Sequence, residues 1–397
     1  MNWISIMYGG TALWATAACS KGAHRAISTG SQPVIKVASV AATRPAQTGS
    51  LRFYFVLDAT STRAASVQYA TTDGTAKAGV DYTPVNGTAN IPAGQTQAYL
   101  DVPVTGDSLR RPDQTFYLQL SSPVNCTLDS SQATATIVNS NLPYLPTDTT
   151  GYSTPASYAG YHLAWSDEFS GNVLDRQNWT FDIGNNNGWG NQELEYYTSS
   201  TNNAFVSSGN LVIEARKESI NGSGYSSARL KTEGIQQFTY GRIDIRARLP
   251  VGHGMWPALW MLGSDITTLS WPGCGETDIM ELIGSNPNRV TGSMHWQNSD
   301  GSEGTYNNNY YLPTGDFSQR FHVYSLLWQH DTVQFFVDDS LYVNGGINNV
   351  TSGAYPFNLP FFFIFNVAVG GSWPGPPDNT TVFPQRMFVD YVRVFQR

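Results

Sequence analysis

The sequence predicts an all-β protein that is built from two β-sandwiches. Short runs that alternate apolar and polar residues recur along the chain, as in strands with one buried face, and helix signals are nearly absent. The 397 residues include 37 Gly and 21 Pro, so turns are frequent. This length allows two or three domains of about 100–200 residues each.

The distribution of tryptophan divides the chain. Two of the 11 Trp residues lie in the first 14 positions, none lies between Ala15 and Ala164, and nine lie between Trp165 and Trp373. We therefore expect a domain boundary near residue 160.

The charge balance excludes several classes of function. Lys and Arg number 22 against 30 Asp and Glu, a net charge of −8, and no basic run is present, so the chain has no electrostatic footprint for nucleic acid or an anionic membrane. No apolar stretch reaches the ~18 residues of a transmembrane helix. Charged residues make up 13% of the chain and aromatic residues 13%. This composition favours a neutral, hydroxylated ligand.

The N-terminal segment resembles an export signal. Residues 1–19 are apolar and rich in small residues, and they read as a secretory signal peptide. The end of this segment also resembles a bacterial lipoprotein cleavage box, with Cys19 as the lipidated residue. Residues 20–33 read as a linker. We expect a secreted or cell-surface protein, with lipid attachment through Cys19 as one form of anchoring.

Residues 34–140 predict a first domain with an immunoglobulin-like fold. Short alternating runs separated by turn signals are typical of an antiparallel sandwich of about seven strands. The expected strands include residues 51–57, 66–72, 97–104, 115–120 and 133–138.

This first domain resembles the Calx-β module. The segments that carry the resemblance are DGTAKAGVDYTPVNGTANIPAGQT (73–96), GDSLRRPDQTFYLQLSSP (106–123) and the closing ATATIVN (133–139). The resemblance implies loops that often bind calcium through several carboxylates. Asp73 and Asp81 match such positions, but other expected acids read Arg44-Pro45, Arg111-Pro112 and Asn139-Ser140. Because calcium takes six to eight oxygen ligands, we expect a spacer or adhesive module without bound metal.

Residues 141–160 are rich in Pro, Ser, Thr and Gly and predict a semi-extended linker. The second domain, residues 161–397, has perhaps a dozen predicted strands and fits a large jelly-roll sandwich. In YGRIDIRARLP (240–250) one face carries the apolar residues and the other the charged ones. Folds of this kind bind long ligands across the concave face of one sheet.

One string in the second domain carries three acids, GETDIMELIG (275–284). On a regular strand Glu276 and Asp278 would share a face and Glu281 would point into the core, where an unpaired carboxylate is very costly. A bulge at Ile279 or Met280 would bring all three acids to one face. A surface acidic strand is the alternative, and the apolar flanking residues disfavour it.

Three carboxylates on one face suit glycoside hydrolysis. One must be ionised to attack the anomeric carbon, and another must hold a proton for the leaving oxygen. Crowding of like charges separates their pKa values and supplies both forms near neutral pH. The residues alone leave open the separation of the carboxyl groups, which decides between retention and inversion.

The second domain resembles glycoside hydrolase family 16, specifically its laminarinase-type members, which cleave internal β-1,3-glucosidic bonds. By this resemblance Glu276 is the nucleophile, Glu281 the acid/base and Asp278 the residue that tunes Glu276, in a retaining double displacement. The bulged E-x-D-x-x-E form belongs to the laminarinase side of the family. The matching blocks are LAWSDEFSGNVLD (163–175), GWGNQELEYYT (188–198), SSARLKTEG (226–234), MWPALWML (255–262), WPGCGETDIMELIG (271–284), GGSWPG (370–375) and FPQRMFVDYVRVFQ (383–396).

Aromatic residues are candidates for sugar contacts. Trp256 and Trp260 lie four residues apart on a predicted strand and so on one face, where they could stack on sugar C–H surfaces, although core packing is the alternative for either one. Trp373 lies in a loop rich in Gly and Pro and resembles the family's cleft Trp.

The resemblance implies five further site residues. Asn191 and Arg229 match polar residues that hydrogen-bond sugar hydroxyls, and His295 occupies the family's cleft His position. Glu168 and Asp390 lie where many relatives bind a structural calcium opposite the cleft.

The sequence therefore predicts a secreted endo-β-1,3-glucanase with an N-terminal Calx-β module. We expect no cofactor for the chemistry, a structural calcium in the second domain, a β-glucan substrate and a monomeric chain. One alternative is an endo-β-1,3(4)-glucanase or transglycosylase that acts on mixed-linkage or other β-glycans. Another is a glucan-recognition protein without catalysis, although relatives of that kind lose the carboxylates that this chain keeps.

Overall fold

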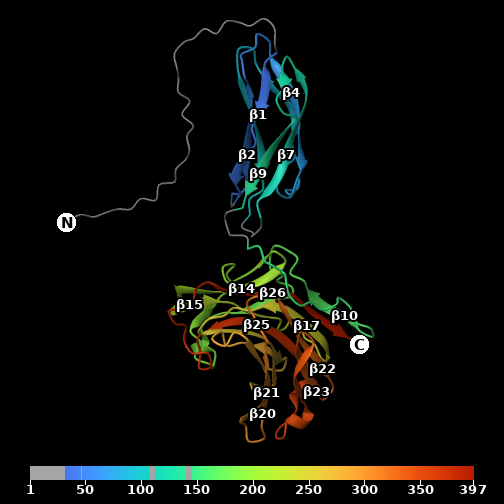
Figure 1. Cartoon of the computed structure of the whole chain (residues 1–397), viewed down its shortest axis with the longest axis vertical. Coiled ribbons are helices and arrows are strands. Elements are labelled where there is room, and N and C mark those ends of the chain that lie inside the picture. Colours follow the sequence, from blue (N-terminus) through green and yellow to red (C-terminus); the bar gives the residue numbers. More distant parts are fainter. Residues whose placement is uncertain (1–31, 46, 108–111, 140–144) are drawn as a thin grey trace, which may run out of the picture.

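The computed structural model describes residues 32–45, 47–107, 112–139 and 145–397. Figure 1 shows two β-rich bodies, which confirms the all-β prediction. The predicted signal segment, Cys19 and most of the 20–33 linker lie outside the described residues. None of the helices in the described part of the chain is long and apolar enough to cross a membrane.

The N-terminal domain is a sandwich of a four-stranded sheet, in the order β6-β3-β1-β8, and a five-stranded sheet, in the order β2-β9-β7-β4-β5. The predicted alternation is confirmed in β3, where Leu51, Phe53, Phe55 and Leu57 are buried and the residues between them are exposed. The strands are β1 (Val34–Val37), β2 (Val40–Thr43), β3 (Gly49–Leu57), β4 (Ala65–Asp73), β5 (Asn86–Ile91), β6 (Gln97–Val104), β7 (Gln114–Val124), β8 (Thr127–Leu128) and β9 (Gln132–Val138).

A buried arginine joins the loops at one end of this sandwich. Arg44 is 1% exposed, and its guanidinium donates hydrogen bonds to Asn139 Oδ1 at 2.7 Å, Thr105 O at 2.8 Å, Gln114 Oε1 at 2.6 Å and Asp81 Oδ1 at 3.0 Å. These oxygens come from segments far apart in the sequence. The positive charge that balances Asp81 is therefore supplied by the chain itself.

The C-terminal domain packs two large sheets face to face. The seven-stranded sheet has the order β11-β16-β25-β18-β19-β20-β21, and the ten-stranded sheet contains the path β12-β15-β14-β26-β17-β22-β23-β24, with β10 and β13 at its side. The strands of the seven-stranded sheet are β11 (Thr180–Asp182), β16 (Arg229–Lys231), β18 (Met255–Gly263), β19 (Glu276–Glu281), β20 (Arg289–Gln297), β21 (Glu303–Tyr311) and β25 (Phe361–Val369).

The ten-stranded sheet covers the inner face of the seven-stranded sheet. Its strands are β10 (His162–Asp167), β12 (Glu195–Tyr197), β13 (Ala204–Ser207), β14 (Asn210–Ile220), β15 (Ser223–Ser227), β17 (Gly241–Arg248), β22 (His322–Gln329), β23 (Thr332–Val337), β24 (Ser340–Gly346) and β26 (Gln385–Gln396). Three short 3-10 helices are described in this domain, η1 (Asn186–Gly188), η2 (Ile347–Asn349) and η3 (Pro356–Asn358).

Strand β25 lies inside the seven-stranded sheet and is buried along its whole length. Phe361, Phe363 and Phe365 belong to the main core between the sheets, whereas Phe362 and Ile364 pack in a smaller cluster. Side chains alternate along a strand, so Asn366 shares the face of Phe362 and Ile364. This polar residue therefore lies on the outer face of the sheet, where it lines the groove described below.

Residues 145–158, which we name the strap, run along the C-terminal domain. They cover the charged face of β17, so that Asp244 is 0% and Arg246 5% exposed. Arg246 donates to the carbonyl oxygens of Thr149 and Tyr152, both at 2.6 Å, and the Tyr158 hydroxyl donates to Asp244 Oδ2 at 2.6 Å. The sequence analysis predicted a semi-extended linker here, but these hydrogen bonds to β17 make the strap part of the C-terminal domain.

Candidate active site

A groove of about 750 Å³ lies on the seven-stranded sheet. Its walls contain all nine side chains that the sequence analysis placed at the cleft. They are Asn191, Arg229, Trp256, Trp260, Glu276, Asp278, Glu281, His295 and Trp373.

The predicted bulge in β19 is confirmed by the strand register. Trp260 of β18 pairs with Asp278, but Leu259 pairs with Met280, so Ile279 is the extra residue. Ile279 and Met280 are both 0% exposed and belong to the core. The two apolar residues thus fill the interior while Glu276, Asp278 and Glu281 all line the groove. Burial of Ile279 and Met280 stabilises this local geometry, since each removes a large apolar surface from water.

Glu281 is arranged to hold a proton near neutral pH. Burial raises the pKa of its carboxyl to about 8, and the negative charge of Asp278 adds to this, although His295 and a hydrogen bond from Trp256 act in the other direction. That bond runs from Trp256 Nε1 to Glu281 Oε1 at 3.0 Å. A carboxyl with this pKa can give a proton to a leaving oxygen.

Glu276 and Asp278 lie two residues apart on the same strand. Burial and the charge of Asp278 raise the pKa of Glu276 well above its usual range, and the positive charge of His295 opposes the shift. A positive charge that develops on a bound sugar next to Glu276 would act in the same direction as His295 and favour the ionised form against this shift.

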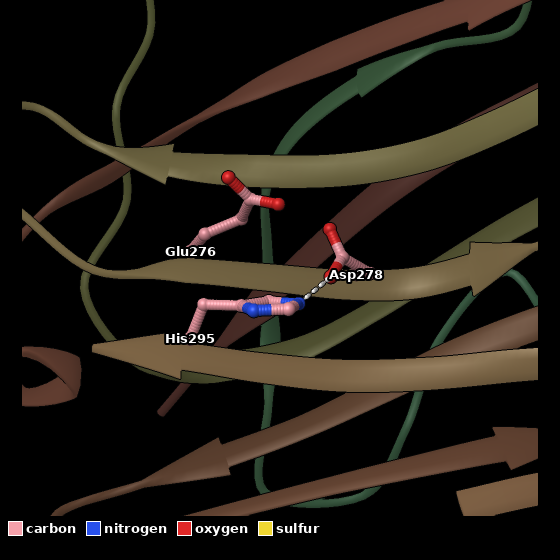
Figure 2. A group of neighbouring side chains, drawn as sticks. All are labelled: Glu276, Asp278 and His295. Atoms are coloured by element: carbon pink, nitrogen blue, oxygen red, sulfur yellow. Dashed lines mark ion pairs between the residues drawn. The ribbon is translucent and has the colours of Figure 1, made fainter. Parts of the chain in front are cut away.

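His295 projects from β20, where it pairs with Glu276. Its Nε2 lies 3.0 Å from Asp278 Oδ2, and its Nδ1 lies 2.6 Å from Glu303 Oε1. Burial disfavours the imidazolium, but Asp278, Glu276 and Glu303 outweigh it and raise the pKa of His295 to about 10. Figure 2 shows Glu276, Asp278 and His295 gathered together from neighbouring strands. At neutral pH His295 is thus a cation that offsets part of the negative charge of the acids.

Two sets of residues are candidate metal ligands. Ligand atoms of Glu276, Asp278 and His295 lie within 4.8 Å of one another, but His295 is already paired with Asp278. Glu168 and Asp390, the expected calcium ligands, are bound by arginines: Arg393 holds both oxygens of Glu168 at 2.7 Å, and Arg246 holds Asp390 Oδ2 at 2.6 Å. Three of their four carboxylate oxygens therefore accept hydrogen bonds from guanidinium groups, and the calcium site stays a prediction.

Aromatic rings and a guanidinium form one wall of the groove. The Arg229 guanidinium lies 4.8 Å from the ring centroids of both Trp189 and Trp260. Its Nε is 3.0 Å from Asp182 Oδ2, an ion pair that holds the guanidinium in place. Trp260 Nε1 donates to Asn366 Oδ1 at 2.8 Å, so this ring has a fixed orientation.

Trp373 lines the groove next to Trp256. Its ring lies edge-on to Trp256, with centroids 5.4 Å apart and planes at 79°, and it remains 41% exposed. Trp256 and Trp260 are partly exposed rather than buried in the core. Trp256 and Trp260 therefore line the groove, although Trp260 also packs against the small cluster that contains Phe362 and Ile364.

Several groove residues were missed by sequence reasoning. Glu193, Asn366 and Glu303 line the groove, and the wholly buried Glu195 lies behind it. Glu193 and Glu195 occur in a string that we used only for the family resemblance. Two acids in a strand-like segment close to Trp189 were the available signal, but their roles depend on contacts made by β25.

A groove with three clustered carboxylates and aromatic walls is a site suited to breaking bonds between neutral sugars. The family model described as "Glycosyl hydrolases family 16" matches residues 191–393, more than half of the chain, and the protein belongs to this family. It is therefore a glycosyl hydrolase. The model of the Calx-beta domain matches residues 32–141, in agreement with the first domain.

Similar proteins carry related names. The chain is 44% identical over 247 residues to "Beta-glucanase" of Rhodothermus marinus, which covers 59% of this chain and 85% of that protein. It is 38% identical over 275 residues to "Glucan endo-1,3-beta-glucosidase A1" of Niallia circulans, covering 62% of this chain and 39% of that protein. Among solved structures, the laminarinase catalytic domain of Thermotoga maritima MSB8 is 48% identical with a TM-score of 0.56, over 60% of this chain and 98% of that one.

Proposed function

We propose that this protein is a secreted endo-β-1,3-glucanase that hydrolyses laminarin-type glucans with retention of anomeric configuration. The observation that carries the proposal is the bulge at Ile279, which brings Glu276, Asp278 and Glu281 to one groove. The names of the similar proteins support the β-1,3-linkage.

The reaction has two steps. In the first, Glu281 transfers its proton to the glycosidic oxygen while a Glu276 oxygen bonds to the anomeric carbon, and the bond from that carbon to the leaving oxygen breaks. In the second, Glu281 takes a proton from water, whose oxygen displaces Glu276 from the anomeric carbon. Both residues return to their starting forms, so no cofactor is consumed.

The remaining groove residues orient the substrate and adjust charge. Asp278 is a neighbour of both Glu276 and His295, so its charge acts on Glu276 and is partly balanced by the imidazolium. Trp256, Trp260 and Trp373 offer ring faces and edges to the apolar C–H surfaces of glucose, which has no charge for the protein to recognise.

Product analysis on laminarin, lichenan and agarose tests the substrate. We expect rapid shortening of laminarin with oligosaccharide products, and no hydrolysis of laminarin would reject the proposal. Equal or faster cleavage of lichenan would favour the β-1,3(4) alternative. Proton NMR of the first products distinguishes retention from inversion, because a retaining enzyme releases the β-anomer first.

Replacement of the nucleophile tests the mechanism. Glu276→Gln keeps the shape of the side chain but replaces the nucleophilic carboxylate with a neutral amide, so we expect kcat on laminarin to fall by a factor of about 10⁴ or more. Glu233→Gln, an acid that forms a salt bridge with Lys231 and is absent from the groove lining, is the matched control. If Glu276→Gln hydrolysed laminarin at the wild-type rate, the nucleophile assignment would be wrong.

A further inference from the structure

A second pair of carboxyl groups lies behind the groove wall. Glu195 at the start of β12 is 0% exposed, and its Oε2 accepts a hydrogen bond from the Val369 backbone N–H of β25 at 2.6 Å. Within the described residues no group donates to its Oε1, which is fully buried. The side chain of Glu193 interacts with the carboxyl group of Glu195. A buried oxygen without a donor, beside another carboxylate, requires a proton.

Glu193 is the member of the pair that reaches the groove. It is 5% exposed, and its Oε1 accepts from Asn191 Nδ2 at 3.2 Å while its Oε2 accepts from the Tyr197 hydroxyl at 2.9 Å. Asn191 is one of the predicted sugar-binding residues. The position of its amide therefore depends on the carboxylate of Glu193.

The hydrogen bonds that lead to Glu193 all run in the same direction. Trp260 Nε1 donates to Asn366 Oδ1 at 2.8 Å, and Asn366 Nδ2 donates to the Tyr197 oxygen at 3.1 Å. The Tyr197 hydroxyl then donates to Glu193. A chain of donors that ends on one carboxylate stabilises that carboxylate as the anion. Glu193 is thus the ionised member of the pair, and the proton belongs to Glu195.

We propose that Glu195 is a positioning residue that is kept as a neutral acid and donates its proton from Oε1 to the carboxylate of Glu193, so that the pair carries one negative charge and holds Asn191 and Trp260 in their sugar-binding positions. This inference rests on the proposed glucanase function for its ligand. The geometry of the pair itself does not depend on which glucan is bound.

The charges around the pair agree with this assignment. Burial raises the pKa of Glu195 well above its usual range, and the charge of Glu193 adds to the shift. Tyr197 also faces the pair, and burial together with the two acids raises its pKa, so that it remains a donor. Arg229 of β16 is the nearby cation, and Asp182 already neutralises part of its charge. Strand β25 presents the uncharged Asn366 and a backbone N–H.

Alkaline pH should therefore weaken the positioning of Asn191 and Trp260 by the Glu193–Glu195 pair. When Glu195 loses its proton, two buried carboxylates face each other and Glu193 loses a donor. We expect the affinity for a laminarin oligosaccharide to weaken about tenfold, the effect of losing one hydrogen bond to a charged group. Glu195→Gln supplies an amide donor that does not titrate, so it should remove the part of the pH dependence that comes from the pair.

The experiment measures binding in protein that carries Glu281→Gln, so that the carboxyl of Glu281 no longer titrates. Calorimetry gives the Kd of laminaritetraose from neutral to alkaline pH for the full chain carrying Glu281→Gln, alone or with Glu195→Gln. Glu276 and His295 titrate in both variants, so the comparison between the two isolates Glu195. From neutral to alkaline pH we expect the Kd of the single variant to rise about tenfold more than that of the double variant. Glu233→Gln in the same background is the control, because this acid is absent from the groove lining and the alkaline weakening should persist.

Infrared spectroscopy tests the proton without any ligand. The difference spectrum between wild type and Glu195→Gln at neutral pH should show the loss of a carbonyl band of a neutral carboxylic acid. Loss of an ionised carboxylate band instead would overturn the proposal, as would equal pH dependence of Kd in the two binding variants. If the infrared band is present but laminarin oligosaccharides do not bind, the proposed substrate fails and the pair stands.

Discussion

Removal of the indole N–H of Trp256 should extend activity to higher pH. Trp256 Nε1 donates to Glu281 Oε1 at 3.0 Å, and this bond stabilises the ionised carboxylate, which lowers its pKa. Trp256→Phe keeps an aromatic ring but has no donor. Without the bond the anion is less stable, so the pKa of Glu281 rises from about 8 and the acid keeps its proton at higher pH.

The size of the shift follows from the strength of the bond. A hydrogen bond to a charged group contributes about 1.5–3 kcal/mol, and one pKa unit corresponds to about 1.36 kcal/mol. Glu281 is partly open to the groove, so water replaces some of the lost bond. We therefore expect the alkaline limb of kcat/KM to move upward by about one unit.

The assay is the pH profile of kcat/KM on laminarin for wild type and variant. Trp373→Phe is the matched control, because the Trp373 ring packs edge-on against Trp256 and is not the donor to Glu281. For Trp373→Phe we expect the maximum of kcat/KM to change while the pH of the alkaline limb stays the same. An unchanged or lowered limb in Trp256→Phe would refute the assignment of Glu281 as the acid that Trp256 modulates.

Two further predictions concern stability. Tyr158→Phe removes the strap hydroxyl that donates to the buried Asp244. We expect the free energy of unfolding of the C-terminal domain, measured from its melting, to fall by roughly 1–3 kcal/mol. The nearby Tyr161→Phe is the control and should change it little. An equal loss in both variants would contradict an integral strap. Arg44→Ala leaves Asp81 buried without its guanidinium and should destabilise the N-terminal domain by ~3–5 kcal/mol. Arg52→Ala breaks an exposed ion pair and should change the stability of this domain far less. Calcium should leave the melting temperature of the wild-type N-terminal domain unchanged. A clear rise of this melting temperature with calcium would contradict the role given to Arg44.

Residues close together in the sequence could be assigned without the structure. The alternation of β3 and β17 revealed which side chains face the core, because side-chain direction repeats every two residues. The same rule located the bulge, since a regular strand would have directed Glu281 into the core. These inferences needed only local geometry and the cost of burying a carboxylate.

Local patterns could not reveal partners that lie far along the chain. The strap looked like a linker because its composition is polar and turn-rich, yet Tyr158 meets Asp244 86 residues away. Glu168 and Asp390 kept the residue types expected of calcium ligands, but Arg393 and Arg246 bind them. The charge of a neighbour decides what a carboxylate can bind, and that neighbour is known only from the fold.

By itself, then, the sequence determined two β-sandwiches, the family of the second and the acids that line its groove. Only the tertiary structure decided the protonation and positioning of those acids and the existence of the Glu193–Glu195 pair. The reason is physical: strand patterns depend on neighbouring residues, whereas burial, ion pairing and hydrogen-bond direction depend on β12, β16, β19, β20 and β25 being brought together in space.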